Sequence, residues 1–554
     1  MRRWNMLAGL AMGIAASAHA GPAGHDPGTT SVEAGQLTYY AASGDTLISI
    51  AQKLTTSVNN WSVLGKLNHV GNDRRIPIGS AIVIPANLLP DEPSEATVSA
   101  FSGQVTLTPA KGAPVTAGIG SRIAEGGEVA TGPSGFVTFA LPDGSHISLP
   151  SNSRVKLTVL RMARFTKSPR TEVTLEEGDV ESRVSPLEAN KGRYEVHSVL
   201  ATAGVRGTHF RVAVVGQGIA NEVLGGVVAV GMANKPASID LTAGKGNIVD
   251  AHAVGKPVPL LAAPELAAGY ELQERTAVQF HVADLAGAVS YHGQIARDVE
   301  AQNVVAEAHS QGNRLKIDGL PDGDYFLRVS AIDNLGLEGL PRIVPFKLKA
   351  RPVPPFSSQP KAKLRAENVD FAWIDAPDAK FYHLQVAKDA AFHDVLIDQP
   401  QVGGLQFASG KLAPGKYYWR TASVAEHDGK LDHGPFGDAQ AFELLEPQKL
   451  APIADAGGKE FSFNWPSEPG QKFLVQIGRD AEFKSLLLEK QTDENEIHMP
   501  RPPAGTYFVR VQATDPDGYV GAFSAAQKFT IYSRLSAGTG DAVKAGDADV
   551  RTGL

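Results

Sequence analysis

The sequence contains no cysteine in its 554 residues. This absence excludes disulfide bonds, thiolate metal sites and cysteine nucleophiles. Aromatic residues make up only 7% of the chain, whereas glycine and proline are frequent, with 57 and 36 residues. Such a composition favours a protein with many turns over a large α-helical one. At this length, we expect several domains, each stabilised by its own apolar core.

Basic residues and long apolar runs are also scarce. The chain has 52 Lys and Arg residues against 59 Asp and Glu residues, for a net charge of -7. Because Lys and Arg supply most contacts to phosphates, we expect no nucleic acid partner. No run of eighteen apolar residues follows the first twenty residues, so the sequence predicts no transmembrane segment in the mature chain.

Motifs of the common hydrolases and nucleotide-binding enzymes are missing as well. The sequence contains no H-E-x-x-H, no G-x-S-x-G and no P-loop. We therefore expect a protein that is not an enzyme, with no catalytic residues, no cofactor and no metal site. The densest histidine cluster, residues 426–433, is predicted to be an exposed hairpin loop, and residues 515–518 (DPDG) are predicted to be a turn.

The first twenty residues have the organisation of a secretory signal peptide. Arg2 and Arg3 precede a short apolar stretch, residues 7–16, and Ala18-His19-Ala20 forms a small-residue cleavage site. The sequence therefore predicts export to the periplasm, the cell envelope or the cell surface. Residues 21–35 are rich in Gly, Pro, Ser and Thr, which predicts a flexible lead-in.

Residues 36–86 have the pattern strand, helix, helix, strand. The stretch SGDTLISIAQKL predicts a helix with Asp45 as its N-cap and with Leu47, Ile50 and Leu54 on one apolar face. A second helix is predicted in NNWSVLGKLNHV, capped by Asn60. Its expected inward-facing residues are Trp61, Leu64 and Leu67.

Four separated motifs in this segment occur in the order found in a known family. They are GDTL at residues 44–47, IA at 50–51, LN at 67–68 and IVIP at 82–85. Residues 36–86 thus resemble a LysM domain. The resemblance implies binding of N-acetylglucosamine glycans, chiefly peptidoglycan, in a shallow groove between the loop after the first strand and the loop before the last.

The resemblance also implies which residues bind the glycan. The second loop, residues 72–75 (NDRR), is longer and more charged than is usual in the family. The expected glycan-binding residues are Ser43, Gly44, Asp45, Thr46 and Leu47 on one side of the groove, and Asn72, Arg74, Ile76 and Ile78 on the other.

A polar linker, residues 87–96, leads into short alternating runs that predict an all-β segment. Residues 97–250 resemble the FecR domain through the runs EGGEVATG, LPDGS, LEEGDV and AGVRGTHFRV. The resemblance implies a twisted, solenoid-like β architecture. In the best-known members, this domain is the periplasmic part of an iron-transport signalling protein. Its most specific motif, to which we assign a structural role, comprises Gly204, Val205, Arg206, Gly207, Thr208 and Phe210.

Residues 262–535 repeat with a period of about 91. Gln294, Gln385 and Gln476 recur at that interval, as does a Gly-x-Tyr-x-x-Arg motif around Tyr325, Tyr417 and Tyr507. The unit resembles a fibronectin type III or immunoglobulin-like sandwich, with repeats at 262–351, 352–446 and 447–535 and a disordered tail at 536–554. The repeated Trp and Tyr residues are predicted to be core anchors.

The sequence thus predicts a multidomain, mainly β protein: a small βααβ domain, a β-solenoid-like domain and three β-sandwiches. We expect a non-enzymatic envelope protein that binds peptidoglycan and presents its other modules to an unknown envelope protein partner. Two alternatives remain open: a signalling component that senses through the FecR-like domain, and an accessory subunit of a glycan-active enzyme.

Overall fold

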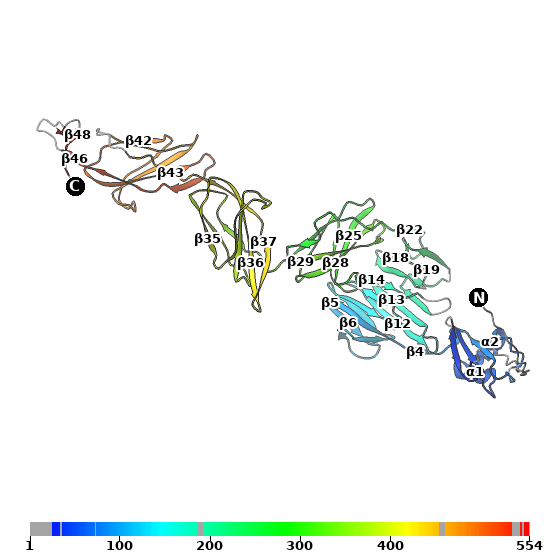
Figure 1. Cartoon of the computed structure of the whole chain (residues 1–554). Helices are drawn as coiled ribbons and strands as arrows, with labels where there is room; N and C mark the ends of the chain where they lie inside the picture. The colour runs from blue at the N-terminus through cyan, green and yellow to red at the C-terminus, as the bar shows by residue number, and fades with distance from the viewer. Residues whose placement is uncertain are drawn as a thin grey trace, which may run out of the picture. The chain divides into compact units, whose positions relative to one another are not determined.

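The computed structural model describes residues 25–33, 36–72, 74–186, 192–205, 207–235, 237–453, 460–534, 543–545 and 548–552. The chain divides into two compact units, Met1–Leu348 and Lys349–Leu554 (Figure 1). The prediction of a multidomain, mainly β protein is confirmed. The expected signal peptide lies outside the described residues. Among the described helices, none has the length and apolarity needed to cross a membrane.

The N-terminal domain packs two short α-helices against a three-stranded antiparallel sheet of order β1-β2-β3. Leu47, Ile50 and Leu54 are buried as the helical period predicts, whereas in the second helix only Leu64 is buried. The elements are β1 (Thr30–Glu33), β2 (Gln36–Tyr40), α1 (Leu47–Leu54), a 3-10 helix (Val58–Asn60), α2 (Trp61–Leu67), β3 (Ala81–Ile84) and a second 3-10 helix (Ala86–Leu88).

Two boundaries of this domain differ from the sequence-based expectation. Strand β1 lies inside the predicted lead-in and pairs along its whole length with β2. The expected linker also contains regular structure, since β4 (Asp91–Pro93) pairs with a strand of the next domain and β5 begins at Glu95. Strands β1 and β4 were not predicted because their sequences are polar, and short strands at a sheet edge need few apolar residues.

The following domain, called here the two-sheet domain (residues 91–259), has two facing sheets with the core between them. The first sheet runs β22 (Val258–Pro259), β21 (Lys245–Val249), β18 (Gly218–Gly225), β17 (His209–Val215), β14 (Asp179–Arg183), β11 (His146–Leu149), β10 (Phe136–Ala140), β5 (Glu95–Ser102) and β8 (Arg122–Ala124). The second runs β20 (Ser238–Thr242), β19 (Val227–Met232), β16 (Ala201–Val205), β15 (Arg193–His197), β13 (Pro169–Glu177), β12 (Arg154–Ala163), β9 (Glu128–Thr131), β6 (Val105–Thr108) and β7 (Val115–Thr116), with β4 paired to β12.

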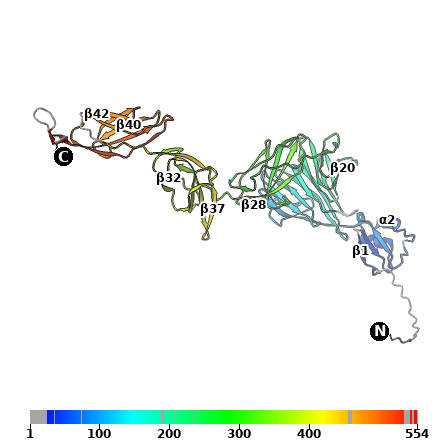
Figure 2. The same ribbon diagram turned by 45° about the horizontal axis from the view of Figure 1, so that its top comes forward.

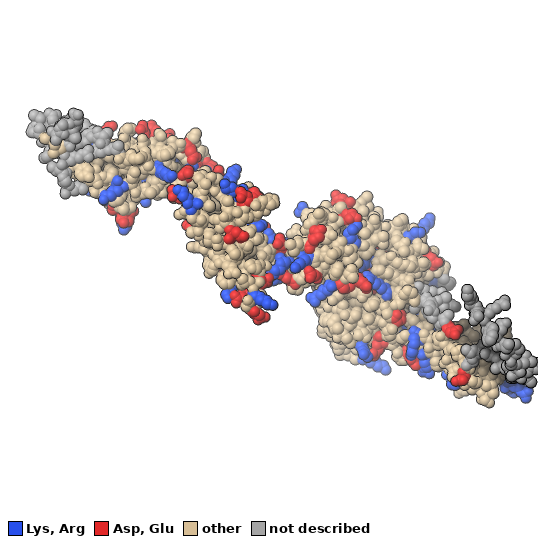
Figure 3. Space-filling model, viewed as in Figure 1, with Lys and Arg blue, Asp and Glu red and all other residues tan. Residues whose placement is uncertain are grey.

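The chain alternates between these sheets after every one or two strands, so it winds around the core as a flattened coil (Figure 2). Alternating sequences produce this layering, because every second side chain of a strand points inward. In β13, for example, Thr171, Val173 and Leu175 are buried and the residues between them are not. On the visible face of the chain, acidic and basic side chains are interspersed (Figure 3).

The first sandwich completes the first unit. Its larger sheet has the order β23-β29-β28-β25-β26, and β24 pairs with β27 in the smaller one. The strands are β23 (Leu272–Gln273), β24 (Val278–His281), β25 (Ala288–Ala296), β26 (Val304–Ser310), β27 (Arg314–Ile317), β28 (Gly323–Asp333) and β29 (Arg342–Leu348).

The second unit contains two more sandwiches and a short C-terminal segment. The second sandwich comprises β30 (Ser357–Gln359), β31 (Lys363–Arg365), β32 (Asn368–Trp373), β33 (Phe381–Ala387), β34 (Val395–Val402), β35 (Gln406–Lys411), β36 (Gly415–His427), β37 (Lys430–Phe436) and β38 (Gln440–Leu445). The third comprises β39 (Glu460–Asn464), β40 (Lys472–Gly478), β41 (Leu486–Thr492), β42 (Glu496–Pro500), β43 (Gly505–Thr514), β44 (Val520–Phe523) and β45 (Gln527–Ile531). Within the expected tail and just before it, two short pairs form: β46 (Ser533–Arg534) with β49 (Arg551–Thr552), and β47 (Lys544–Ala545) with β48 (Ala548–Asp549).

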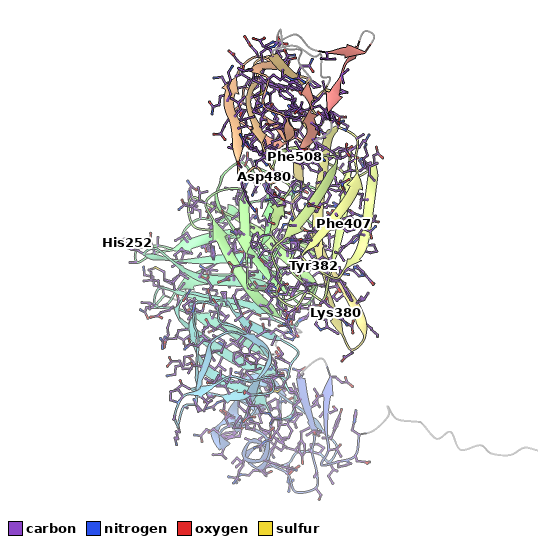
Figure 4. All side chains as sticks on the ribbon, turned by 90° about the vertical axis from the view of Figure 1, so that its left-hand side faces the viewer. His252, Lys380, Tyr382, Phe407, Asp480 and Phe508 are labelled. Atoms are coloured by element: carbon purple, nitrogen blue, oxygen red, sulfur yellow. The ribbon has the colours of Figure 1, made fainter. Side chains whose placement is uncertain are left out.

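The repeated residues of the sandwiches have consistent structural roles. The hydroxyl groups of Tyr325, Tyr417 and Tyr507 each donate to a carbonyl four residues earlier, at 2.9, 2.6 and 2.9 Å. Trp373 and Trp465 are buried, as predicted. Asp480, labelled in Figure 4, accepts backbone N–H bonds from Lys484 and Ser485 and so holds the loop between β40 and β41. Asp298 and Asp389 hold the corresponding loops in the same way.

Candidate functional site

The two loops predicted to form a glycan groove lie side by side in the N-terminal domain. The Ala41 N–H donates to the Ser80 carbonyl at 2.9 Å, and the Gly79 N–H donates to the Ala41 carbonyl at 2.7 Å. These bonds fix the loop after β2 against the loop before β3. The arrangement expected from the sequence, in which one loop faces the other, therefore exists in the fold.

Asp45 shapes the first loop, but it is not the helix cap. Thr46 is the N-cap of α1, and it exchanges hydrogen bonds with Ser49 in a capping box. The Asp45 carboxylate instead accepts the Ala42 N–H and the Tyr39 hydroxyl, both at 2.7 Å. The prediction failed because Asp and Thr are both good caps and the spacing to Ser49 selects Thr46. Burial, together with the Asp45 carboxylate, raises the pKa of Tyr39 to about 12.

The predicted site residues divide into an exposed set, a buried set and two half-buried residues, Asp45 and Thr46. Leu47 and Ile76 are part of the domain core, so they shape the loops from below. Ile78 is 61% exposed. Gly44, at φ +84°, occupies a left-handed position that favours glycine. The exposed members are Ser43, Gly44, Asn72, Arg74 and Ile78.

Asn72 organises the charged loop on the second side of the groove. Its Oδ1 accepts the Arg74 N–H at 3.1 Å, and its carbonyl accepts the Arg75 N–H at 3.2 Å. The loop therefore turns tightly at this point, and Arg74 and Arg75 remain exposed. The residue between Asn72 and Arg74 lies outside the described residues.

A hollow that the sequence reasoning missed adjoins the first loop. It has a volume of about 640 Å³ and is open to solvent. Trp61 was predicted to point inward, but it is 38% exposed and borders this hollow. The helical period could not indicate this exposure, because in the structure only Leu64 of the short helix α2 is buried. The lining residues are Leu47, Trp61, Ser62, Gly65, Lys66, His69, Val70 and Gly71.

Asn68 holds the end of α2 against strand β3. Its Oδ1 accepts the Val83 N–H at 2.7 Å, while its Nδ2 donates to the Val83 and Leu64 carbonyls, both at 2.9 Å. The side chain thus satisfies both backbone groups of a residue in β3. This explains why Asn follows Leu at the end of the second helix, because a shorter or apolar side chain would leave the Val83 N–H and carbonyl unpaired.

The exposed Ser43, Gly44, Asn72 and Ile78 suit an uncharged, amphipathic group, and Arg74 and Arg75 add positive charge beside them. An N-acetyl group presents one carbonyl, one N–H and one methyl, which a shallow polar surface with exposed apolar side chains can contact. Exposed Ile78 and Trp61 supply apolar area, and Trp rings also stack on sugar faces. Within the described residues of this domain, no group of three metal-ligating side chains converges.

The second motif picked out from the sequence lies at a tight turn of the two-sheet domain. Gly204 and Val205 end β16, and Gly207 has φ +82°. The Thr208 hydroxyl donates to the Val227 carbonyl at 3.0 Å, and Phe210 is buried against Tyr194. Arg206 lies outside the described residues.

Comparison with known families agrees with both motif readings. Residues 39–85 match the model of the LysM domain, and residues 127–229 match the model of the FecR protein. No curated protein matches the chain.

Several solved structures match parts of the chain. Two crystal structures of a candidate anti-sigma factor from Parabacteroides distasonis ATCC 8503 are 22% identical to it, with a TM-score of 0.20. These matches cover 24% of this chain and 57% of that protein, so the chain spans little more than half of its relative's length. The FN1-FN3 domains of chicken CNTN1 are 14% identical, with a TM-score of 0.19, over 48% of this chain and 97% of that one. The chain therefore carries a LysM domain followed by a FecR domain, and the three β-sandwiches described above come after them.

Proposed function

We propose that this protein is a non-enzymatic, exported cell-envelope protein that binds peptidoglycan through its LysM domain. In this proposal the FecR domain and the sandwiches are interaction modules for an envelope protein partner. The LysM domain holds them close to the cell wall and so raises their local concentration near that partner.

The observation that carries the proposal is the geometry of the N-terminal domain. The N-terminal domain matches the LysM family model. Its two groove loops are joined by backbone hydrogen bonds between Ala41 and residues Gly79 and Ser80. The exposed residues of those loops are small, amide-bearing or apolar, apart from Arg74 and Arg75. This is the chemistry that an N-acetylated glycan requires.

Retention on purified, insoluble peptidoglycan tests the proposal. The protein without residues 1–20 is used whole, because Ala163 of the two-sheet domain belongs to the LysM core and an isolated fragment would lose it. We expect the protein to sediment with peptidoglycan. Ile78→Asp should reduce retention because it places a charge on the groove. Gln52→Ala, on the exposed side of α1, is the matched control and should bind normally. Failure of the unmodified protein to sediment would refute the proposal.

The FecR match favours envelope signalling as a second candidate function. Under this alternative, the FecR domain would contact a receptor or transporter and relay its occupancy. A gene for a sigma factor beside the gene for this protein, and altered activity of that factor on deletion, would support it. Unchanged sigma-factor activity would argue against it.

A further inference from the structure

The first sandwich covers the first sheet of the two-sheet domain through a buried ionic network. Arg211 of β17 donates to Glu222 at 2.7 Å and to Glu338 of the sandwich, also at 2.7 Å. Arg328 of β28 lies 2.6 Å from Glu181 of β14. A cavity of about 220 Å³ lies between these groups.

Negative charge is in excess around this cavity. Four carboxylates line it, against the two guanidinium groups of Arg211 and Arg328. Buried charges are stabilised by pairing, so further positive charge, from protonated His292 or from a bound cation, would stabilise this cavity. The lining carboxylates are Asp179, Glu181, Glu222 and Glu338.

The side chains that could supply this charge lie on two adjacent strands. His292 of β25 pairs directly across the sheet with His309 of β26, and their rings stack at 4.1 Å with an interplanar angle of 8°. Glu307, two residues before His309, projects from the same face, and its Oε2 lies 3.1 Å from His292 Nε2. One donor atom from each of the three residues lies within 4.8 Å of the others.

We propose that His292, Glu307 and His309 bind a divalent transition-metal ion of the Zn²⁺ type. Two imidazoles and one carboxylate are a donor set that Zn²⁺ prefers, with a fourth position left for water. The inference is independent of peptidoglycan binding. The ion would replace the bond between His292 and Glu307 and neutralise part of the excess acidic charge.

The surroundings of the three residues fit this role. Glu338 Oε2 lies 3.2 Å from His292 Nδ1, so it can orient the ring and leave Nε2 for the metal. His309 is exposed and can rotate to shorten the distances.

A second group of similar composition lacks the charge excess. Glu172, Glu195 and His197 also converge, but Arg193 lies 2.6 Å from Glu195 and 3.8 Å from Glu172. The Arg193 guanidinium already neutralises these two carboxylates, so this group does not need a metal ion. The site in the first sandwich has no spacing motif, because its ligands come from two strands, and we therefore expected no metal from the sequence.

The second sandwich offers a matched control. His383 and Asp398 follow His292 and Glu307 by 91 residues and are also within hydrogen-bond distance of each other. The position equivalent to His309 is Pro400, so the third ligand is missing. A His383→Ala variant thus removes a histidine in the same local setting without touching the proposed site.

The experiment uses the whole protein without residues 1–20 and without a histidine tag, after treatment with EDTA. Zn²⁺ is titrated by calorimetry, and Co²⁺ by its visible absorption. We expect one ion per chain, a tetrahedral Co²⁺ spectrum and an affinity that increases with pH, because protons compete with metal ions for imidazole and carboxylate ligands. His309→Ala and Glu307→Gln should weaken binding at least tenfold, with His383→Ala unchanged. Circular dichroism verifies folding, and His309 is the safer change because it is exposed. Absence of binding, or equal affinity in His309→Ala and the unmodified protein, would overturn the assignment.

Discussion

Arg328 of the first sandwich lies 2.6 Å from Glu181 of the FecR domain, although the two residues are far apart in sequence. Both side chains are almost fully buried, with 6% and 12% of their surface exposed. Glu181 also lies 2.6 Å from His209 of the FecR motif region. These contacts join the FecR domain and the first sandwich into one structural body.

Removing Arg328 should therefore destabilise the first unit. Arg328→Met leaves Glu181 buried without its main partner, which we expect to cost about 3–5 kcal/mol of unfolding free energy. Arg122→Met is the control, because its ion pair with Glu95 is 3.5 Å long and exposed and should contribute less than about 1 kcal/mol. Urea denaturation measures both. Equal, small losses in the two variants would show that the junction pair contributes little.

The ionic contact between the FecR domain and the first sandwich, called here the ionic junction, should weaken at alkaline pH. Burial alone would lower the pKa of His292, but the charges of Glu338 and Glu307 outweigh it and raise the pKa to about 10. The folded state thus keeps a proton that the unfolded chain releases near its ordinary pKa of about 6.5. The stability from this proton is complete below pH 6.5 and is lost as pH rises toward 10. Burial also raises the pKa of Asp179 to about 6 and that of Glu222 to about 7, so these two carboxyl groups lose their protons in the lower part of this pH range.

Calorimetry in EDTA at pH values from 6.5 to 9 measures this effect. The unfolding temperature of the first unit should fall across this range in the unmodified protein. His292→Gln, which cannot titrate, should be less stable near pH 6.5 but should show a flatter pH dependence. Parallel curves for the two proteins would exclude His292 as the titrating group.

The local elements could be predicted from the sequence because their signals are local. The LysM motifs, the helical period of Leu47, Ile50 and Leu54, and the alternation in β13 each depend on neighbouring residues. The repeat period likewise located the buried Tyr417 and Trp373. The exposure of Trp61 was missed because periodicity gives the spacing of a face but not how much of it the core covers.

The ionic junction could not be predicted, because its partners are distant in sequence. Arg211 and Glu338 are 127 residues apart, and although Arg211 lies in the AGVRGTHFRV run, nothing in that run indicates its partner. The sequence repeats also give no indication of this junction, because the residues equivalent to Arg328 in the other two sandwiches have different partners. Arg420 and Arg510, equivalent to Arg328, stack on two phenylalanines each and donate to Gln385 and Gln476 within their own sandwich. One repeated residue thus serves two different purposes, and only the tertiary structure distinguishes them.

Asp515 illustrates the same limit in the second unit. Its segment was read as a turn, and it does form one, yet the carboxylate is buried between two sandwiches. Arg365 Nη2 lies 3.0 Å from it and Lys363 Nζ lies 2.7 Å from it. Burial raises the pKa of Asp515, but Lys363, Gln471 and Arg365 outweigh that effect and hold the pKa below its ordinary value.

Asp515→Asn should loosen the contact between the second and third sandwiches. The amide keeps the shape but removes the charge that pairs with buried Arg365, which we expect to cost about 1–3 kcal/mol. Limited proteolysis between the two sandwiches and urea denaturation both report the change. Asp517→Asn, at an exposed neighbouring position that also contacts Lys363, is the control and should have little effect. Loss of stability in Asp517→Asn alone would contradict the argument.

The repeated tyrosines allow a sharper test of what a single hydrogen bond contributes in these sandwiches. The Tyr417 hydroxyl donates to the Ala413 carbonyl at 2.6 Å, while its ring is buried against Phe442. Tyr417→Phe preserves the ring packing and removes only this bond, so we expect a loss of about 1 kcal/mol. Tyr417→Ala should cost about 3–5 kcal/mol, because it also leaves a cavity in the core. Thermal unfolding of both variants separates the two contributions. If Tyr417→Phe were as unstable as Tyr417→Ala, the hydroxyl bond rather than the buried ring would be the principal anchor of the sandwich.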